Sequence, residues 1–114
     1  MGNKTEFKKC KSVDEVIASM PERFHPENCQ NLQAVYQWEL SEPGKFFHVI
    51  IIINGTFQLE NGKHEKPNVT IMCSTDVYLK LVNKELKDII AILTKRLMIK
   101  GSMSLGQKLS KFFV

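Results

Sequence analysis

Cysteine is scarce in this 114-residue sequence. The chain has Cys10, Cys29 and Cys73, which are far apart and include no Cys-x-x-Cys pair. Three dispersed cysteines supply neither a disulfide framework nor a four-ligand zinc site. We therefore expect free thiols in a reducing compartment, and the predicted location is cytoplasmic.

Long apolar segments are also missing. The most apolar stretch, "FFHVIIII" at residues 46–53, is too short to cross a bilayer, and no apolar run follows the initial "MGNKTEFKK". The sequence thus predicts neither a membrane span nor a secretion signal. The Asn-x-Thr patterns at Asn3, Asn54 and Asn68 are then expected to be chance matches to the glycosylation motif.

Arginine is represented by Arg23 and Arg96 alone, although the net charge is +4. Nucleic-acid readers cluster arginine with aromatic residues on one face, so no nucleic-acid partner is predicted. The lysines concentrate in the first eleven residues and in the last third of the chain. We interpret them as a solvated surface, and transient contact with an anionic membrane surface is left open.

The overall composition is that of one globular domain. Hydrophobic residues make up 43% of the chain and charged residues 25%, which argues against disorder. We predict a basic N-terminal tail over residues 1–11 and a single folded domain over residues 12–114.

The stretch "IKGSMSLGQKLSKFF", residues 99–113, comes close to a phosphate-binding loop. Such a loop needs lysine and then a hydroxyl directly after its second glycine. Here Lys108 comes one residue late after Gly106, which turns it by about 100° around a helix. Leu109 then occupies the place of the magnesium-binding hydroxyl. A nucleotide site is therefore excluded.

No other constellation predicts catalysis, a cofactor or a metal. His25 and Cys29 lie in a proline-bounded loop without a further ligand nearby. His48 lies inside an apolar strand, where a hydrogen-bonded structural histidine is expected rather than a metal or haem ligand. No nucleophile stands beside a base, and no carboxylate pair stands out. The protein is predicted not to be an enzyme.

Hydrophobic periodicity predicts the order helix, four strands, two helices, strand, helix. Ser12 and Glu15 form a capping box for the first helix, which Pro21 should end. The predicted helices cover residues 12–20, 75–83, 84–93 and 102–113, and the predicted strands cover residues 32–40, 46–53, 56–60, 68–74 and 95–101.

Strand 46–53 is expected to be central and buried on both faces, because it is rich in β-branched residues. Asn54-Gly55 is a strong hairpin signal, and Asn83 is a residue that tolerates a left-handed helix cap. Hairpin-linked strands favour an antiparallel sheet with helices packed on one face, an α+β domain.

This ordered set of segments resembles the sterol carrier protein type-two family from about Ser12 onward. The shared features include a strand with Tyr36-x-Trp38 and the segment "VTIMCSTDVYLKLV" before a helix. At the end, a strand runs into glycine, a small polar residue and a helix with Leu-x-x-Lys-Leu. The matching residues are Leu97, Ile99, Gly101, Leu105, Lys108 and Leu109.

The resemblance implies a mainly antiparallel five-stranded sheet, helices over one face and an apolar tunnel between them. The implied function is intracellular binding and transfer of a hydrophobic small molecule, namely a fatty acid, a fatty acyl-CoA or a sterol, without a cofactor. The alternative is a non-enzymatic accessory domain whose apolar groove binds a partner protein. The oligomeric state is left open.

The candidate lipid-binding residues are apolar positions of the strands and helices together with one amide, Gln107, which could contact a lipid carboxylate or hydroxyl. They are Trp38, Phe47, Val49, Ile51, Leu79, Ile89, Ile90, Leu93, Leu97, Met103, Leu105, Gln107, Leu109, Phe112 and Phe113.

Overall fold

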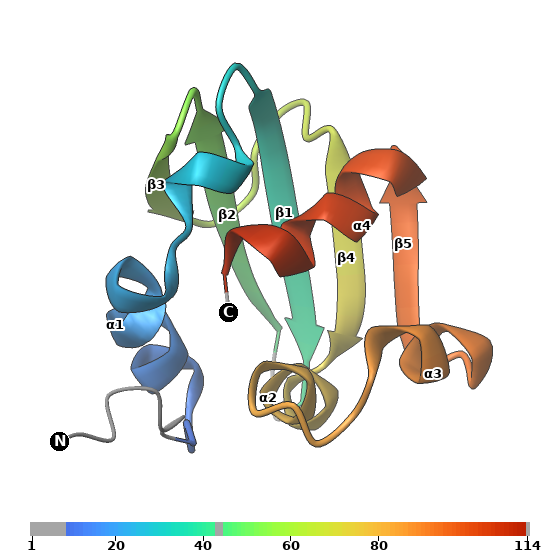
Figure 1. Ribbon diagram of the computed structural model, residues 1–114. Helices are drawn as coiled ribbons and strands as arrows, with labels where there is room; N and C mark the ends of the chain where they lie inside the picture. The colour runs from blue at the N-terminus through green and yellow to red at the C-terminus, as the bar shows by residue number, and fades with distance from the viewer. Residues whose placement is uncertain (1–8, 43–44, 114) are drawn as a thin grey trace, which may run out of the picture.

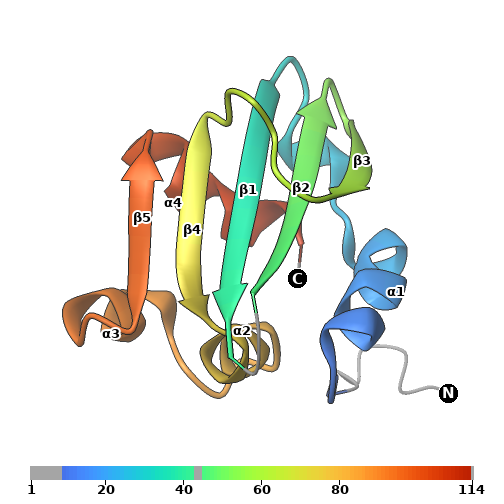
Figure 2. The ribbon, with the colours of Figure 1, turned by 180° about the vertical axis from the view of Figure 1, so that it is seen from behind.

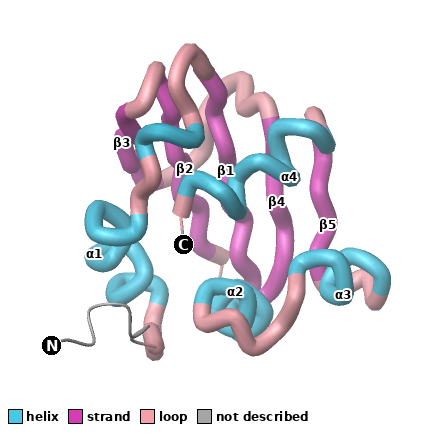
Figure 3. The backbone as a smooth tube through the Cα atoms, viewed as in Figure 1, coloured by secondary structure: helices cyan, strands magenta, loops and turns pink. Residues whose placement is uncertain are grey.

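A five-stranded sheet carries helices on one of its faces, as Figures 1 and 3 show from the helical side. The computed structural model describes residues 9–42 and 45–113. In chain order the elements are α1 (Val13–Arg23), a 3-10 turn (Pro26–Asn28), β1 (Gln33–Ser41), β2 (Phe46–Ile53), β3 (Thr56–Asn61), β4 (Val69–Ser74), α2 (Thr75–Val82), α3 (Asp88–Leu93), β5 (Leu97–Gly101) and α4 (Met103–Phe112). The predicted α+β class and the order of its elements are confirmed.

The strand order is β3-β2-β1-β4-β5. Three of the four pairings are antiparallel, and β1 pairs with β4 in parallel. Strand 46–53 is an inner strand, as predicted, with β3 and β1 on its two sides, and β1 occupies the middle of the sheet. The connection from β3 passes over β2 and β1 on the face of the sheet away from α4, which Figure 2 shows from the front, and β4 then joins the free side of β1.

Strand register determines which side chains face the helices. Tyr36 bonds to the α4 backbone and Trp38 stacks edge-on against Tyr78 of α2, so this side of β1 is the helical side. Directly paired residues share a face of the sheet. The helical face therefore also carries His48, Ile50, Ile52, Val69, Ile71, Cys73, Leu97 and Ile99.

The middle of β2 is buried on both faces, as predicted. His48, Val49 and Ile50 follow one another and are each at most 2% exposed. On the open face, the connection between β3 and β4 lies over this region, where the His64 N–H donates to Gln37 Oε1 (2.8 Å).

The first helix begins as predicted but ends later. The Glu15 N–H donates to Ser12 Oγ (3.2 Å), and the Glu15 carboxylate accepts from the Lys11 N–H (2.7 Å). The prediction that Pro21 ends the helix is wrong, since α1 continues to Arg23. Proline removes one hydrogen bond from a helix. The loss of that one hydrogen bond at Pro21 does not end α1, which continues for two more residues.

The reversal after α2 also differs from the prediction. Asn83 has an ordinary φ of −81°, and Lys84 instead adopts the left-handed region with φ 61°. The Asn83 amide bonds the N–H and the carbonyl of Cys10 (2.7 and 2.8 Å). Cys10 is thereby buried, although the sequence places it in the tail. Residues 1–8 of that tail lie outside the described residues.

Candidate functional site

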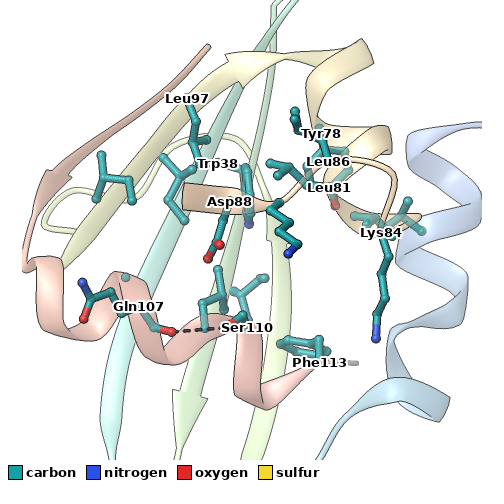
Figure 4. Close-up of a pocket in the computed structure, with 18 of the residues that line it drawn as sticks. Trp38, Tyr78, Leu81, Lys84, Leu86, Asp88, Leu97, Gln107, Ser110 and Phe113 are labelled. Carbon is teal, nitrogen blue, oxygen red and sulfur yellow. Dashed lines mark hydrogen bonds between the residues drawn. The ribbon is translucent and has the colours of Figure 1, made fainter. Parts of the chain in front are cut away.

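An apolar cavity of about 540 Å³ lies between the helical face of the sheet and the helices (Figure 4). This volume is within the range of small-molecule binding sites. Five side chains of the sheet form its floor: Trp38, Ile50, Ile71, Leu97 and Ile99.

The walls come from the helices and from the α2–α3 connection. The N-terminus of α2 is fixed by Ser74, whose hydroxyl accepts from the Val77 N–H (3.1 Å) and so begins the helix directly after β4. The apolar wall residues are Val16, Met20, Tyr78, Leu81, Val82, Leu86, Ile92, Leu109 and Phe113, together with Gly106.

Two glycines position α4 over the sheet. Gly101 has a φ of 96°, and a Cβ there would collide with the Asn68 carbonyl oxygen. Its backbone lets β5 turn directly into α4, where Ser102 caps the helix by accepting from the Leu105 N–H (3.2 Å). Gly106 faces the sheet, and a Cβ there would lie 3.4 Å from Cγ2 of Ile99.

The first turn of α4 is also held by a buried tyrosine. The Tyr36 hydroxyl donates to the Leu105 carbonyl (2.7 Å), and Tyr36 is fully buried. Burial raises the pKa of Tyr36 to about 12, so the hydroxyl keeps its proton and remains a donor at neutral pH.

The C-terminal end of α4 is held by the segment after α1. The His25 N–H donates to the Phe112 carbonyl (2.7 Å), and the Asn28 amide donates to the Lys111 carbonyl (2.7 Å). The Phe113 ring packs against Phe24 and Phe57 at centroid distances of 5.3 and 5.2 Å. Hydrogen bonds thus hold α4 at both ends, with the cavity beside its middle.

Polar groups of the lining come from α1, the α2–α3 connection, the start of α3, and α4. They are Arg23, Lys84, Lys87, Asp88, Gln107 and Ser110. Figure 4 shows the Asp88 carboxylate directed toward α4, while Lys84 extends toward α1. The polar part of the lining thus contains three cationic side chains, one carboxylate and two neutral polar groups.

His48 does not line this cavity. It is 1% exposed, and its Nε2 has no hydrogen-bond partner among the described residues. Burial lowers the pKa of His48 to about 4, so the ring is neutral at physiological pH. Residues 9–42 and 45–113 contain no cluster of metal-ligating side chains and no helix long and apolar enough to span a bilayer.

Five of the predicted site residues line the cavity: Trp38, Leu97, Gln107, Leu109 and Phe113. Phe47, Val49 and Ile51 lie on the opposite face of the sheet, because Ile50 between them pairs with Tyr36. The apolar residues on both sides of β2 gave no sign of which set faces the helices.

The predicted residues of α3 point away from the cavity. Ile89, Ile90 and Leu93 are 53, 42 and 69% exposed, whereas Ala91 is buried and Ile92 lines the cavity. The predicted helix 84–93 begins only at Asp88, so Leu86 lies outside the helix and does not extend the apolar side formed by Ile89, Ile90 and Leu93.

The other four predicted residues are also outside the lining. Leu79, Leu105 and Phe112 pack into the core, and Met103 is 48% exposed. Sequence reasoning missed the Ile50, Ile71 and Ile99 floor, although all three share a face with Trp38 once the register is known. Of the polar lining it found only Gln107.

The model of the SCP-2 sterol transfer family matches residues 14–114. The chain belongs to this family. The resemblance deduced from the order of its segments is thereby confirmed, and membership supports the predicted class of function, lipid binding and transfer.

A longer curated relative matches at the sequence level. Hydroxysteroid dehydrogenase-like protein 2 of Bos taurus is 30% identical over 101 residues, which are 88% of this chain and 24% of that protein. The chain thus spans about a quarter of the relative's length, so the match describes one part of a longer protein.

Solved structures share the fold at low sequence identity. The sec-alkylsulfatase Pisa1 from Pseudomonas sp. superposes with a TM-score of 0.77 at 15% identity, over 91% of this chain and 17% of that one. Palmitated SCP2L2 from Aedes aegypti superposes with a TM-score of 0.71 at 17% identity, over 89% of this chain and 93% of that one. The second match covers almost the whole of both chains and supports the SCP-2 fold directly.

Proposed function

We propose that residues 12–114 form a non-enzymatic lipid carrier that holds a fatty acid, a fatty acyl-CoA or a sterol in the cavity between the sheet and α4. The observation that carries the proposal is the 540 Å³ apolar cavity of a chain in the SCP-2 sterol transfer family. The palmitated relative from Aedes aegypti supports the choice of a long acyl chain.

The expected affinity follows from burial of the hydrocarbon chain. Sixteen methylenes contribute about 13 kcal/mol when they leave water. Association itself costs about 4–15 kcal/mol, which leaves micromolar or tighter binding within reach. Affinity should then depend mainly on chain length and only weakly on the head group.

The head group is proposed to lie at the polar part of the lining. Gln107 offers an amide to a carboxylate or hydroxyl, and Lys87 adds a positive charge to the same lining. Both side chains are exposed, so their contribution to affinity is modest because water competes for the same groups.

The deciding experiment is displacement of a fluorescent fatty acid from the purified protein. Leu109→Glu places a carboxylate in the apolar wall and should weaken binding more than a hundredfold, because an unpaired buried charge is costly. Lys108→Glu, its neighbour on the exposed side of α4, is the matched control and should change affinity by less than about threefold. Undiminished binding by a folded Leu109→Glu variant contradicts the proposal.

A second variant covers the case in which Leu109→Glu fails to fold. Leu109→Trp adds bulk without charge and should exclude long chains while circular dichroism stays that of the wild type. If Leu109→Trp binds palmitate as tightly as the wild type, the cavity is not the binding site.

The second candidate is an accessory domain whose groove binds a partner protein. The relative in which the matching segment is a quarter of a longer protein favours this reading. Native mass spectrometry separates the two, since a carrier should retain a bound lipid mass and a partner-binding domain should not.

A further inference from the structure

Helix α3 turns large apolar side chains toward solvent. It lies at a corner of the molecule beside the start of β5 (Figures 1 and 2). Ile89, Ile90 and Leu93 are 53, 42 and 69% exposed, which is unusual for three side chains of one six-residue helix. We call these three residues the α3 patch.

The α3 patch adjoins the cavity. Residues in and directly before α3 line the cavity: Leu86, Lys87, Asp88 and Ile92. One side of α3 therefore contributes to the cavity while the other side presents apolar surface to the outside. A ligand that moves past α3 would pass from one apolar environment to the other without crossing much water.

Positive charge surrounds the patch. Segment 84–96 carries two lysines before α3 and Lys95-Arg96 after it, against Glu85 and Asp88, so its net charge is 4 − 2 = +2. Glu85 is paired with Lys9 (2.8 Å). Lys87, Lys95 and Arg96 are exposed, so their charges are available to an anionic surface.

We propose that the α3 patch and its flanking cations dock on a bilayer that contains anionic phospholipids. Apolar side chains at the acyl boundary with basic residues at the head groups are the combination that holds short helices at membranes. Each basic residue near such a surface adds favourable free energy, and the effect falls within a Debye length. Docking depends only on these residues. Exchange of ligand at the bilayer depends in addition on the proposed function.

A second copy of the chain fits the patch less well than a membrane does. A stable protein interface buries about 800 Å² on each partner. Three partly exposed side chains on a helix about 9 Å long provide only a fraction of that area. Positive charge around the patch would also repel a second copy that presents the same surface.

Vesicle co-sedimentation tests the proposal. The wild type should bind vesicles of equimolar phosphatidylcholine and phosphatidylserine, bind phosphatidylcholine vesicles more weakly, and lose affinity as salt is raised. The double variant Ile89→Ser/Leu93→Ser should bind at least tenfold more weakly. The double variant Lys95→Glu/Arg96→Glu should lose the preference for phosphatidylserine.

Two matched controls separate a local effect from a general one. Ile53→Ser removes an apolar side chain that is 46% exposed at the end of β2, at the opposite end of the sheet from α3. Lys108→Glu reverses an exposed charge on α4. Both should bind vesicles within about twofold of the wild type. If Ile53→Ser weakens binding as much as the α3 variant does, docking at α3 is ruled out.

Fatty acid binding in vesicle-free buffer distinguishes this proposal from the proposed function. The α3 variant should bind fatty acid like the wild type, because Ile89 and Leu93 do not line the cavity. Absence of fatty acid binding in the wild type overturns the carrier function and leaves docking standing. Vesicle binding that is absent in the wild type, or undiminished in the α3 variant, overturns docking. Docking on a bilayer is also overturned if the wild type is a dimer that does not bind vesicles and the α3 variant is a monomer.

Discussion

His48 shows what burial does to a single titratable side chain. It lies on the helical face of β2, opposite Trp38, and its neighbours along the strand are apolar. Its Nε2 has no partner within the described residues, and desolvation lowers the pKa of the ring to about 4. The histidine is therefore part of the core, as predicted, but its Nε2 lacks the hydrogen bond that was expected, and its effect is on stability.

We expect His48 to make the fold sensitive to mild acid. Between pH 6.5 and about 4 the unfolded chain takes up a proton at His48 that the folded chain does not. The contribution of the neutral His48 ring to the free energy of unfolding is complete above pH 6.5. It falls as the pH decreases toward 4, by up to about 3 kcal/mol. Urea denaturation at pH 7 and 4.5 measures this. His48→Leu should lose less stability over the interval, and an unchanged pH dependence would show that another group is responsible.

The two glycines beside α4 should respond to alanine in opposite directions. Gly106→Ala adds a Cβ at ordinary contact distance, 3.4 Å from Ile99, and gives a helix interior a better helix former. It should stabilise the protein by about 0.5–1 kcal/mol. Gly101→Ala should destabilise it by more than about 2 kcal/mol, because a φ of 96° and the Asn68 carbonyl both oppose a side chain. Thermal unfolding of the two variants measures both effects, and equal changes in melting temperature would contradict the prediction.

At the scale of elements, the sequence predicted which helices and strands exist better than it predicted which side of each one faces the core. Periodicity, the Ser12 cap and the Asn54-Gly55 hairpin were sufficient for the order of helices and strands, because these signals are local. The parallel pairing of β1 with β4 was not predictable in this way, since it depends on where a long connection leads. Phe47, Val49 and Ile51 were predicted on the cavity side because β2 is apolar on both faces, so its sequence does not indicate which face meets the helices.

The error at α3 has a different cause. The predicted apolar side of helix 84–93 included Leu86, but the turn with Lys84 in the left-handed region delays the start of the helix to Asp88. No glycine or proline marks that turn. The side of α3 that meets the core carries Ala91 and Ile92, so the exposure of the α3 patch became visible only in the structure.

Helix α4 should loosen when its bond to β1 is removed. Tyr36→Phe removes the hydroxyl that donates to the Leu105 carbonyl, which should cost about 1–2 kcal/mol. Amide hydrogen exchange should accelerate in α4 and stay unchanged in α2, because the bond holds only the former. Uniform acceleration across the chain would mean that Tyr36 supports the whole core, and no acceleration would mean that the bond does not hold α4.

At the scale of the whole molecule, the cavity is large compared with the stability of the domain. A rigid, dry void of 540 Å³ would cost about 13 kcal/mol. Domains of this size have about 5–15 kcal/mol in total. We therefore expect the cavity not to stay empty: under the proposed function, an apolar ligand lies along its floor and water lies near its polar lining. Ligand binding should consequently contribute a large part of the stability of the loaded protein.

Fatty acids should raise the melting temperature in proportion to their chain length. At a free concentration a hundred times Kd, a ligand adds about 2.7 kcal/mol, which corresponds to roughly 10 °C for a domain of this size. Palmitic acid has four more methylenes than lauric acid, worth about 3 kcal/mol or roughly two hundredfold in affinity. Thermal shifts at equal concentrations of the two acids measure the difference. Equal shifts would mean that the head group dominates and that the acyl chain does not occupy the apolar floor formed by Trp38, Ile50 and Ile71.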